Sequence, residues 1–80
     1  WASMAEGALP LAAVGPGTEV RVLEVAGGIG MRTRLAGMGV VAGVTLKVLA
    51  NDGGPLLVSC GETRLALGRG MAHRILVQQL

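Results

Sequence analysis

The fold of this 80-residue chain depends on the stretch VAGGIGMRTRLAGMGVVAG, residues 25–43, which holds six glycines and two arginines. Met31, Leu35 and Met38 are spaced i, i+4 and i+7, which places them on one face of an α-helix. Gly39 follows at the position where a helix C-terminus favours positive φ. The stretch therefore predicts a flexible glycine turn, a short helix over about 29–38, and a glycine that ends it.

The same stretch has the glycine content of a phosphate-binding loop but lacks its other residues. A P-loop requires G-x-x-x-x-G-K-[ST], in which backbone N–H groups and the lysine hold the phosphates. Here Gly30 is followed by Met31 and Arg32, without that lysine or a hydroxyl for magnesium. The spacing does not match G-x-G-x-x-G either. The glycines are therefore interpreted as backbone turns, not as a nucleotide site.

Outward from this stretch, the sequence alternates in the manner of β-strands. Residues 18–26 predict a first strand, with a β-bulge near Leu23 because Val20 and Val22 are out of phase with Leu23 and Val25. Further strands are predicted at 44–50, 56–60, 63–67 and 75–78, with turns at 51–55 and 61–62. Residues 9–14 and 69–74 each allow one helical turn. Together these elements predict a mainly β fold, a small five-stranded, partly open SH3-like barrel with one short helix inserted after the first strand.

Length and composition limit the classes of protein. We expect a cloning remnant at residues 1–3 and a single domain over 4–80. The chain is 51% hydrophobic, carries a net charge of +2 and has Trp1 as its only aromatic residue. Scattered arginines and a barrel without aromatic residues disfavour nucleic acid as a partner. No apolar run reaches the roughly 18–20 residues that span a bilayer, and the beginning lacks signal-peptide features, so we expect a cytoplasmic protein without direct membrane insertion.

Reactive side chains are few. Catalytic Ser-His-Asp, Cys-His and paired-carboxylate arrangements are absent from the sequence, so we expect a binding module and not an enzyme. Cys60 and His73 are the only soft metal ligands besides methionine. A structural zinc site requires about four such ligands at paired spacing, so no resident metal or other cofactor is predicted. A weak or intersubunit divalent-metal site that includes Cys60 and His73 is left open.

Arg32 and Arg34 are the charged residues of the predicted helix. They lie about 200° apart around its axis and flank the apolar stripe. Each can extend its alkyl chain along the buried seam, or contact a carboxylate or phosphate of a partner. The spacing alone does not decide between these alternatives.

From Leu9 to Val77 the chain resembles the ferrous iron transport protein A family (FeoA). The most specific match is R-L-x-x-[hydrophobic]-G-[hydrophobic]-x-x-G over residues 34–43, with Met38 and Ala42 standing where the family usually has Leu and Pro. The other matching residues are Leu9-Pro10-Leu11, Pro16-Gly17, Val20, Val22, Gly54-Pro55-Leu56, Val58, Gly61, Arg64, Ala66-Leu67, Ala72, Ile75 and Val77.

The resemblance implies an SH3-like fold and a role in bacterial ferrous iron uptake. It implies an accessory protein that docks on the GTP-binding cytoplasmic domain of the membrane iron transporter and modulates transport or GTPase activity. We expect the partner contacts at the groove between the helix and the barrel, at Met31, Arg32, Arg34, Leu35 and Met38.

The alternative is a metal-responsive domain that binds Fe²⁺ or another divalent ion directly. The same module forms the C-terminal domain of iron-dependent repressors, and a homodimer is left open with it. A third hypothesis, an SH3-like nucleic-acid binder, rests only on the basic isoelectric point near 9.5.

Overall fold

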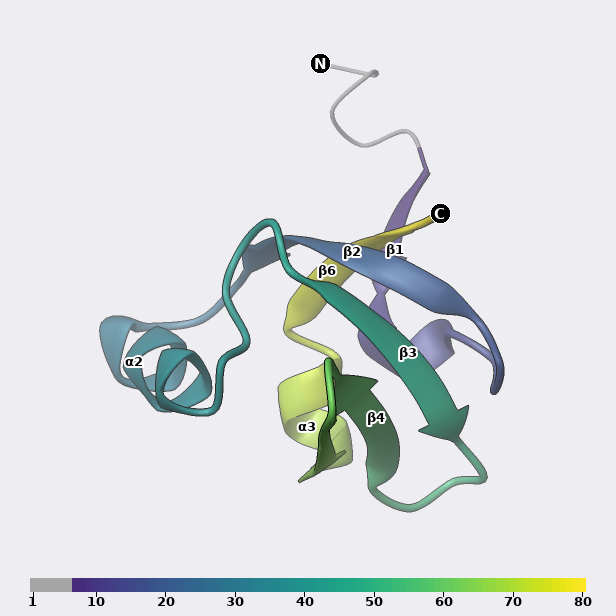
Figure 1. The fold of residues 1–80 in the computed structure, drawn as a ribbon. Helices are drawn as coiled ribbons and strands as arrows, with labels where there is room; N and C mark the ends of the chain where they lie inside the picture. Colours follow the sequence, from purple (N-terminus) through teal and green to yellow (C-terminus); the bar gives the residue numbers. More distant parts are fainter. Residues whose placement is uncertain (1–6) are drawn as a thin grey trace.

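The computed structural model describes residues 7–80, so the expected cloning remnant at 1–3 lies outside the described residues. Figure 1 shows a mainly β protein in which a single bent sheet surrounds the core. All neighbouring strands are antiparallel, in the order β1-β6-β2-β3-β4-β5. The strands are β1 (Ala8–Pro10), β2 (Glu19–Val25), β3 (Thr45–Ala50), β4 (Leu56–Cys60), β5 (Thr63–Leu67) and β6 (Ile75–Gln79).

The described residues form six strands where the sequence predicted five. The additional strand β1 is three residues long, and Leu9 pairs with Val77 of β6. A three-residue strand that ends in proline has no alternation to reveal it. The helical turn expected in this region follows directly as the 3-10 helix η1 (Leu11–Ala13). In chain order the main helix α2 therefore follows the second strand, and β1 and β5 remain the two edges of an open sheet.

The core is aliphatic throughout. The alternation predicted for these strands is confirmed. Val20 and Val22 of β2 and Leu46 and Val48 of β3 are at most 1% exposed, whereas Arg21 and Lys47 between them are exposed and Val44, before β3, is half-buried. Among the described residues no polar or charged side chain is buried. The buried residues are Leu11, Ala12, Val14, Val20, Val22, Leu35, Val40, Leu46, Val48, Leu56, Val58, Leu67, Ala72, Ile75 and Val77.

The predicted bulge in β2 is confirmed. The register between β2 and β6 shifts between Val22 and Glu24, so Leu23 is the additional residue of the bulged strand. Leu23 is 38% exposed, whereas Val22 beside it is buried. The bulge thus resolves the two phases of the alternation and changes the direction of β2 where it leaves β3.

The helix α2 (Ile29–Gly37) lies to one side of the sheet (Figure 1). Its end is a Schellman motif, because the Val40 N–H donates to the Leu35 carbonyl at 2.9 Å and the Gly39 N–H donates to the Ala36 carbonyl at 2.9 Å. Leu35 and Val40, the apolar pair of this motif, are both fully buried. The predicted stop at Gly39 is confirmed by its φ of +87°.

Gly39→Ala is expected to destabilise the protein by about 1 kcal/mol, because the left-handed conformation is less stable by about this amount for an L-residue with a Cβ. A Cβ at Gly39 meets no atom within 4 Å, so the cost comes from the backbone alone. Gly37→Ala is the matched control. Gly37 is helical, equally free of neighbours and without positive φ, so alanine there should stabilise by about 0.5–1 kcal/mol. Urea unfolding measures the change in the free energy of unfolding for both variants, which should have opposite signs. Equal changes would contradict the assignment of a left-handed glycine at position 39.

A polar clamp joins three segments on the opposite end of the molecule. The Asn51 amide donates to the carbonyls of Ala12 at 3.0 Å and Val14 at 2.7 Å, and its Oδ1 accepts from the Arg69 guanidinium. The Arg69 Nε also donates to the carbonyls of Gly53 and Gly54 at 3.2 Å. We call these two side chains the Asn51–Arg69 clamp. It ties η1 to the β3–β4 turn and to the short helix α3 (Arg69–Ala72).

Candidate functional site

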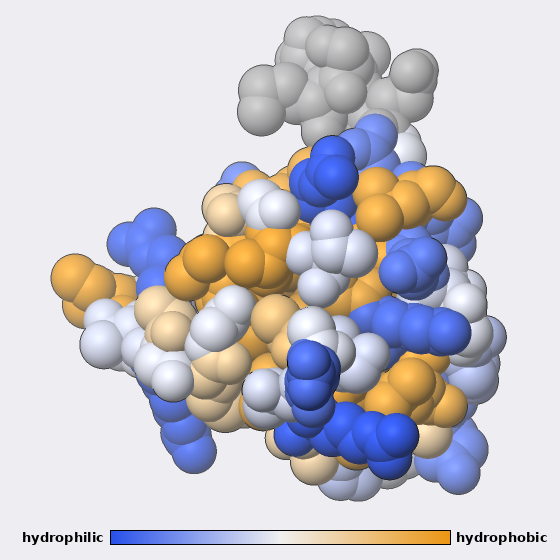
Figure 2. All heavy atoms as spheres, in the orientation of Figure 1, coloured by the Kyte–Doolittle hydropathy of each residue, from blue (hydrophilic) through white to orange (hydrophobic). Residues whose placement is uncertain are grey.

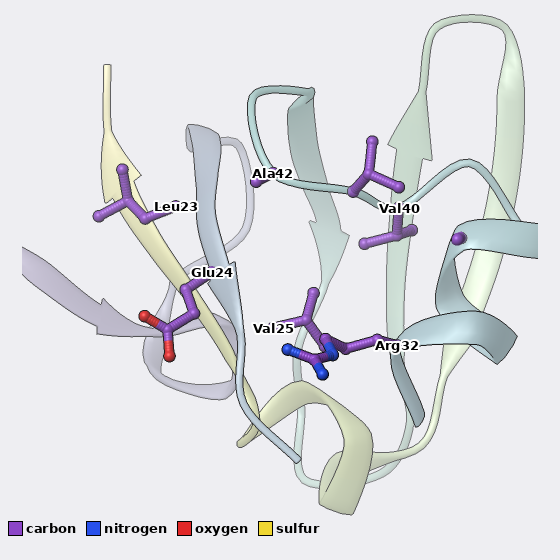
Figure 3. Close-up of a pocket in the computed structure, with 8 residues that line it drawn as sticks. Leu23, Glu24, Val25, Arg32, Val40 and Ala42 are labelled. Atoms are coloured by element: carbon purple, nitrogen blue, oxygen red, sulfur yellow. The ribbon is translucent and has the colours of Figure 1, made fainter. Parts of the chain in front are cut away.

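A groove lies between β2, α2 and the segment that follows α2 (Figure 3). Its volume is about 330 Å³, at the small end of the range for binding pockets. The strand supplies one wall, the helix the opposite wall, and the chain after the Schellman motif closes the end. We call it the β2–α2 groove. It is lined by Leu23, Glu24, Val25, Arg32, Ala36, Val40, Val41 and Ala42.

The lining of the β2–α2 groove is predominantly aliphatic. Leu23 is 38% exposed and Val41 is 43% exposed, and both belong to the four large hydrophobic side chains exposed among the described residues. Figure 2 shows hydrophobic atoms gathered between α2, at the left, and the sheet. Apolar side chains held open to solvent beside a groove are typical of a surface that binds another molecule.

The charge in the groove comes from Arg32. In Figure 3 its side chain reaches from α2 toward β2, and its guanidinium lies beside Val25. The Glu24 carboxylate points away from Val25 on the other side of the strand. The space between helix and strand is therefore an apolar cleft in which the positive charge of Arg32 lies beside Val25. This arrangement suits a ligand that has a carboxylate next to an aliphatic group.

The five residues predicted to contact a partner differ in position and burial. Arg32 lines the β2–α2 groove, but Arg34 is exposed and lies outside its lining. Met31 and Met38 are half-buried against the core. The predicted partner contact at Leu35 must be corrected, because Leu35 is fully buried and its side chain does not reach the surface. The helical period that marked Leu35 is the signal of a core residue.

The strand and loop walls of the groove were not predicted from the sequence. Leu23 and Val25 are brought to it by the β2 bulge, and Val41 and Ala42 by the turn after Gly39. The phase break at Leu23 was the available signal, because bulges commonly direct side chains toward binding sites. Nothing in the sequence alone placed residues 41 and 42 opposite that strand.

The two predicted soft ligands lie on different elements. Cys60 ends β4, and its Sγ lies 4.0 Å from the Gly39 carbonyl, while His73 is exposed at the end of α3. Within residues 7–80, no three His, Cys, Asp or Glu side chains gather in a way that could hold a metal ion. Direct metal binding, through these residues or between two copies, stays a prediction.

Comparison with known proteins shows which family and which structures this chain resembles. The model of the FeoA domain family matches residues 9–79. The Putative Fe(2+) transport protein A of Methanocaldococcus jannaschii is 41% identical over 69 residues, which cover 86% of this chain and 84% of the relative. The crystal structure of an iron uptake regulatory protein (FeoA) superposes with a TM-score of 0.87 at 38% identity, over 91% of this chain and 99% of the other.

A manganese-dependent transcriptional repressor contains a similar domain. It matches with a TM-score of 0.83 at 26% identity, over 91% of this chain but only 42% of the repressor. The fold therefore occurs both in short proteins and as part of longer ones.

The open six-stranded sheet and the helix after β2 define a small protein of the SH3-like fold class. The chain belongs to the FeoA family, since the family model covers most of its length. Among the described residues, α2 is too short to cross a bilayer, and so is each of the other helices.

Proposed function

We propose that this protein is a cytoplasmic accessory component of ferrous iron transport. It docks through the β2–α2 groove on the GTP-binding cytoplasmic domain of the membrane iron transporter, and it modulates transport or GTP hydrolysis. The observation that carries the proposal is the groove itself, in a chain of the FeoA family. It is an aliphatic cleft with a single cation, Arg32 of the helix wall, whose guanidinium lies beside Val25. The relative from M. jannaschii bears the name of an Fe(2+) transport protein.

The chemistry of the groove favours a protein partner over a reaction. Its lining contains one carboxylate and one guanidinium, and the carboxylate points away from the cleft. Aliphatic walls supply binding energy of about 25 cal/mol for each Å² of apolar surface removed from water, but no nucleophile or proton acceptor for catalysis. A non-enzymatic docking role is therefore the proposal.

Titration of the purified GTP-binding domain, alone and within the membrane-embedded transporter, tests this role. Val41→Asp is expected to weaken binding about tenfold, because it buries a charge against the aliphatic wall. Leu80→Asp is the matched control, since Leu80 is also an exposed aliphatic residue, 64% exposed, and lies outside the groove lining. Both affinity and GTPase rate are measured.

Absence of binding and an unchanged GTPase rate with both forms of the partner would remove the proposal. An equal loss of affinity in Val41→Asp and Leu80→Asp would keep the role but place the contact elsewhere. Circular dichroism of both variants checks that they remain folded.

A further inference from the structure

The last residues of β2 have a neighbouring strand on one side only. The strand β3 pairs with β2 through residues 19–21, and that contact ends where the Val22 N–H donates to the Val44 carbonyl at 2.9 Å. The Val22 carbonyl accepts from the Gly43 N–H at 2.7 Å. The strand β6, in contrast, continues to pair as far as Val25. The side of β2 that β3 has left faces the β2–α2 groove.

The bulge determines which way the peptide groups of this open end point. Before the bulge, the Glu19 carbonyl accepts from the Leu80 N–H on the β6 side, and Val22 bonds on the β3 side. After it, the Ala26 N–H donates to the Arg74 carbonyl, again on the β6 side. Since main-chain groups alternate along a strand, the N–H and C=O of Val25 point away from β6. Without the additional residue Leu23, Val25 would share the orientation of Glu19, toward β6.

Val25 therefore presents a main-chain donor and acceptor to the groove. None of the backbone hydrogen bonds that residues 7–80 form outside their helices and strand ladders involves Val25. Its side chain is half-buried and the residue lines the groove. Such a pair of backbone groups at the edge of a sheet is a template for a further extended chain.

We propose that the β2–α2 groove binds an extended segment of a partner protein by strand addition at Val25. One residue of the segment exchanges both main-chain hydrogen bonds with Val25. A neighbouring aliphatic side chain packs between Leu23 and Val41, and an acidic side chain reaches Arg32. The identity of the partner rests on the proposed function, but the mode of binding does not.

Three features of the groove favour an extended, acidic segment as its occupant. A free donor and acceptor match an extended chain, whereas a helix has already bonded its own backbone groups. A volume of about 330 Å³ accommodates a few residues, not a folded domain. The guanidinium of Arg32 beside Val25, on a chain of net charge +2, complements an acidic segment.

The probe is a peptide mixture, acetyl-Thr-X-Glu-X-Thr-amide with X as Val, Ile or Leu, titrated into the ¹⁵N-labelled full chain. We expect the Val25 amide signal to shift and its hydrogen exchange to slow about tenfold at saturation. N-methylation of the peptide, one central residue at a time, should weaken binding about tenfold at alternate positions, because only alternate residues bond to the edge. This readout changes the peptide and leaves the protein intact.

Protein variants test the two recognition elements separately. Val25→Pro removes the N–H that faces the groove and retains the ladder to β6. It should lower the affinity for the peptides about tenfold relative to Val25→Thr, which keeps the donor. Arg32→Glu should weaken binding and should favour peptides with Lys in place of Glu. Arg34→Glu, an equal charge change on the same helix outside the groove lining, should do neither.

Absence of peptide binding at millimolar concentration, equal affinity for every N-methylated peptide, or an unchanged Val25 amide would each overturn strand addition. The same experiments distinguish failure of strand addition from failure of the proposed function. If the peptides bind as described but the GTP-binding domain does not, strand addition stands and the transporter role falls. If that domain binds without slowing exchange at Val25, the role stands and strand addition falls.

Discussion

Leu35→Ala is expected to lower the free energy of unfolding by about 2–5 kcal/mol. Leu35 is the only buried residue of α2. It also contributes the carbonyl and the apolar contact of the Schellman motif with Val40. Removing its side chain leaves a cavity and takes away the one buried anchor between the helix and the core. A domain of this size is stable by about 4–12 kcal/mol in total, so the loss is a large fraction.

Thermal unfolding followed by circular dichroism measures this effect. Each kcal/mol corresponds to roughly 4–8 °C in Tm for a domain of this length. Arg34→Ala, at the adjacent exposed position of α2, is the control and should change stability by less than about 0.5 kcal/mol. Similar effects of Leu35→Ala and Arg34→Ala would mean that α2 is not anchored through Leu35. Because the helix forms one wall of the β2–α2 groove, Leu35→Ala should also weaken partner binding without any direct contact.

Asn51→Leu is expected to destabilise the protein by about 2–3 kcal/mol. The substitution keeps the branching of the side chain at Cγ but leaves the carbonyls of Ala12 and Val14 without the amide that donates to them. It also removes the acceptor for the Arg69 guanidinium. Leaving partly buried polar groups unsatisfied costs about 1–3 kcal/mol. Asp52→Ala, at the next and exposed residue of the same turn, should change stability by less than about 0.5 kcal/mol.

A double-mutant cycle with Arg69→Lys isolates the contact within the Asn51–Arg69 clamp. Lysine keeps the charge but cannot reproduce the planar set of donors that reaches both glycine carbonyls and Asn51. We expect a coupling energy of about 1 kcal/mol between the two substitutions. Strict additivity would show that Asn51 and Arg69 act independently on the segments that they join.

Most of the fold was predictable because its patterns are local. Alternation located five of the six strands, and the phase break at Leu23 located the bulge. Gly39, Gly53 and Gly61 were expected at turns, and all three have positive φ. The exception is β1, whose three residues acquire strand geometry only by pairing with β6 at the far end of the chain. No pattern within Ala8–Pro10 encodes that partner.

The candidate site was predictable only in part, because it is assembled from three separate segments. The helical period identified α2 and drew attention to Arg32, which lines the groove. The same period made Leu35 a predicted contact, although a residue in the centre of an apolar stripe is the one most deeply buried. The opposite wall depends on where β3 leaves β2 and on how the chain turns after Gly39.

By itself, the sequence determined the elements: the aliphatic strands, the glycine turns, the length of α2 and the bulge at Leu23. These follow from side-chain periodicity and from backbone conformations that only glycine adopts readily. The tertiary structure alone decided which of these residues meet. The groove exists because β3 separates from β2 at Val22 while α2, anchored by Leu35, holds Arg32 across the gap. Such contacts between distant segments arise from the packing of one shared core, and no local pattern of residues specifies them.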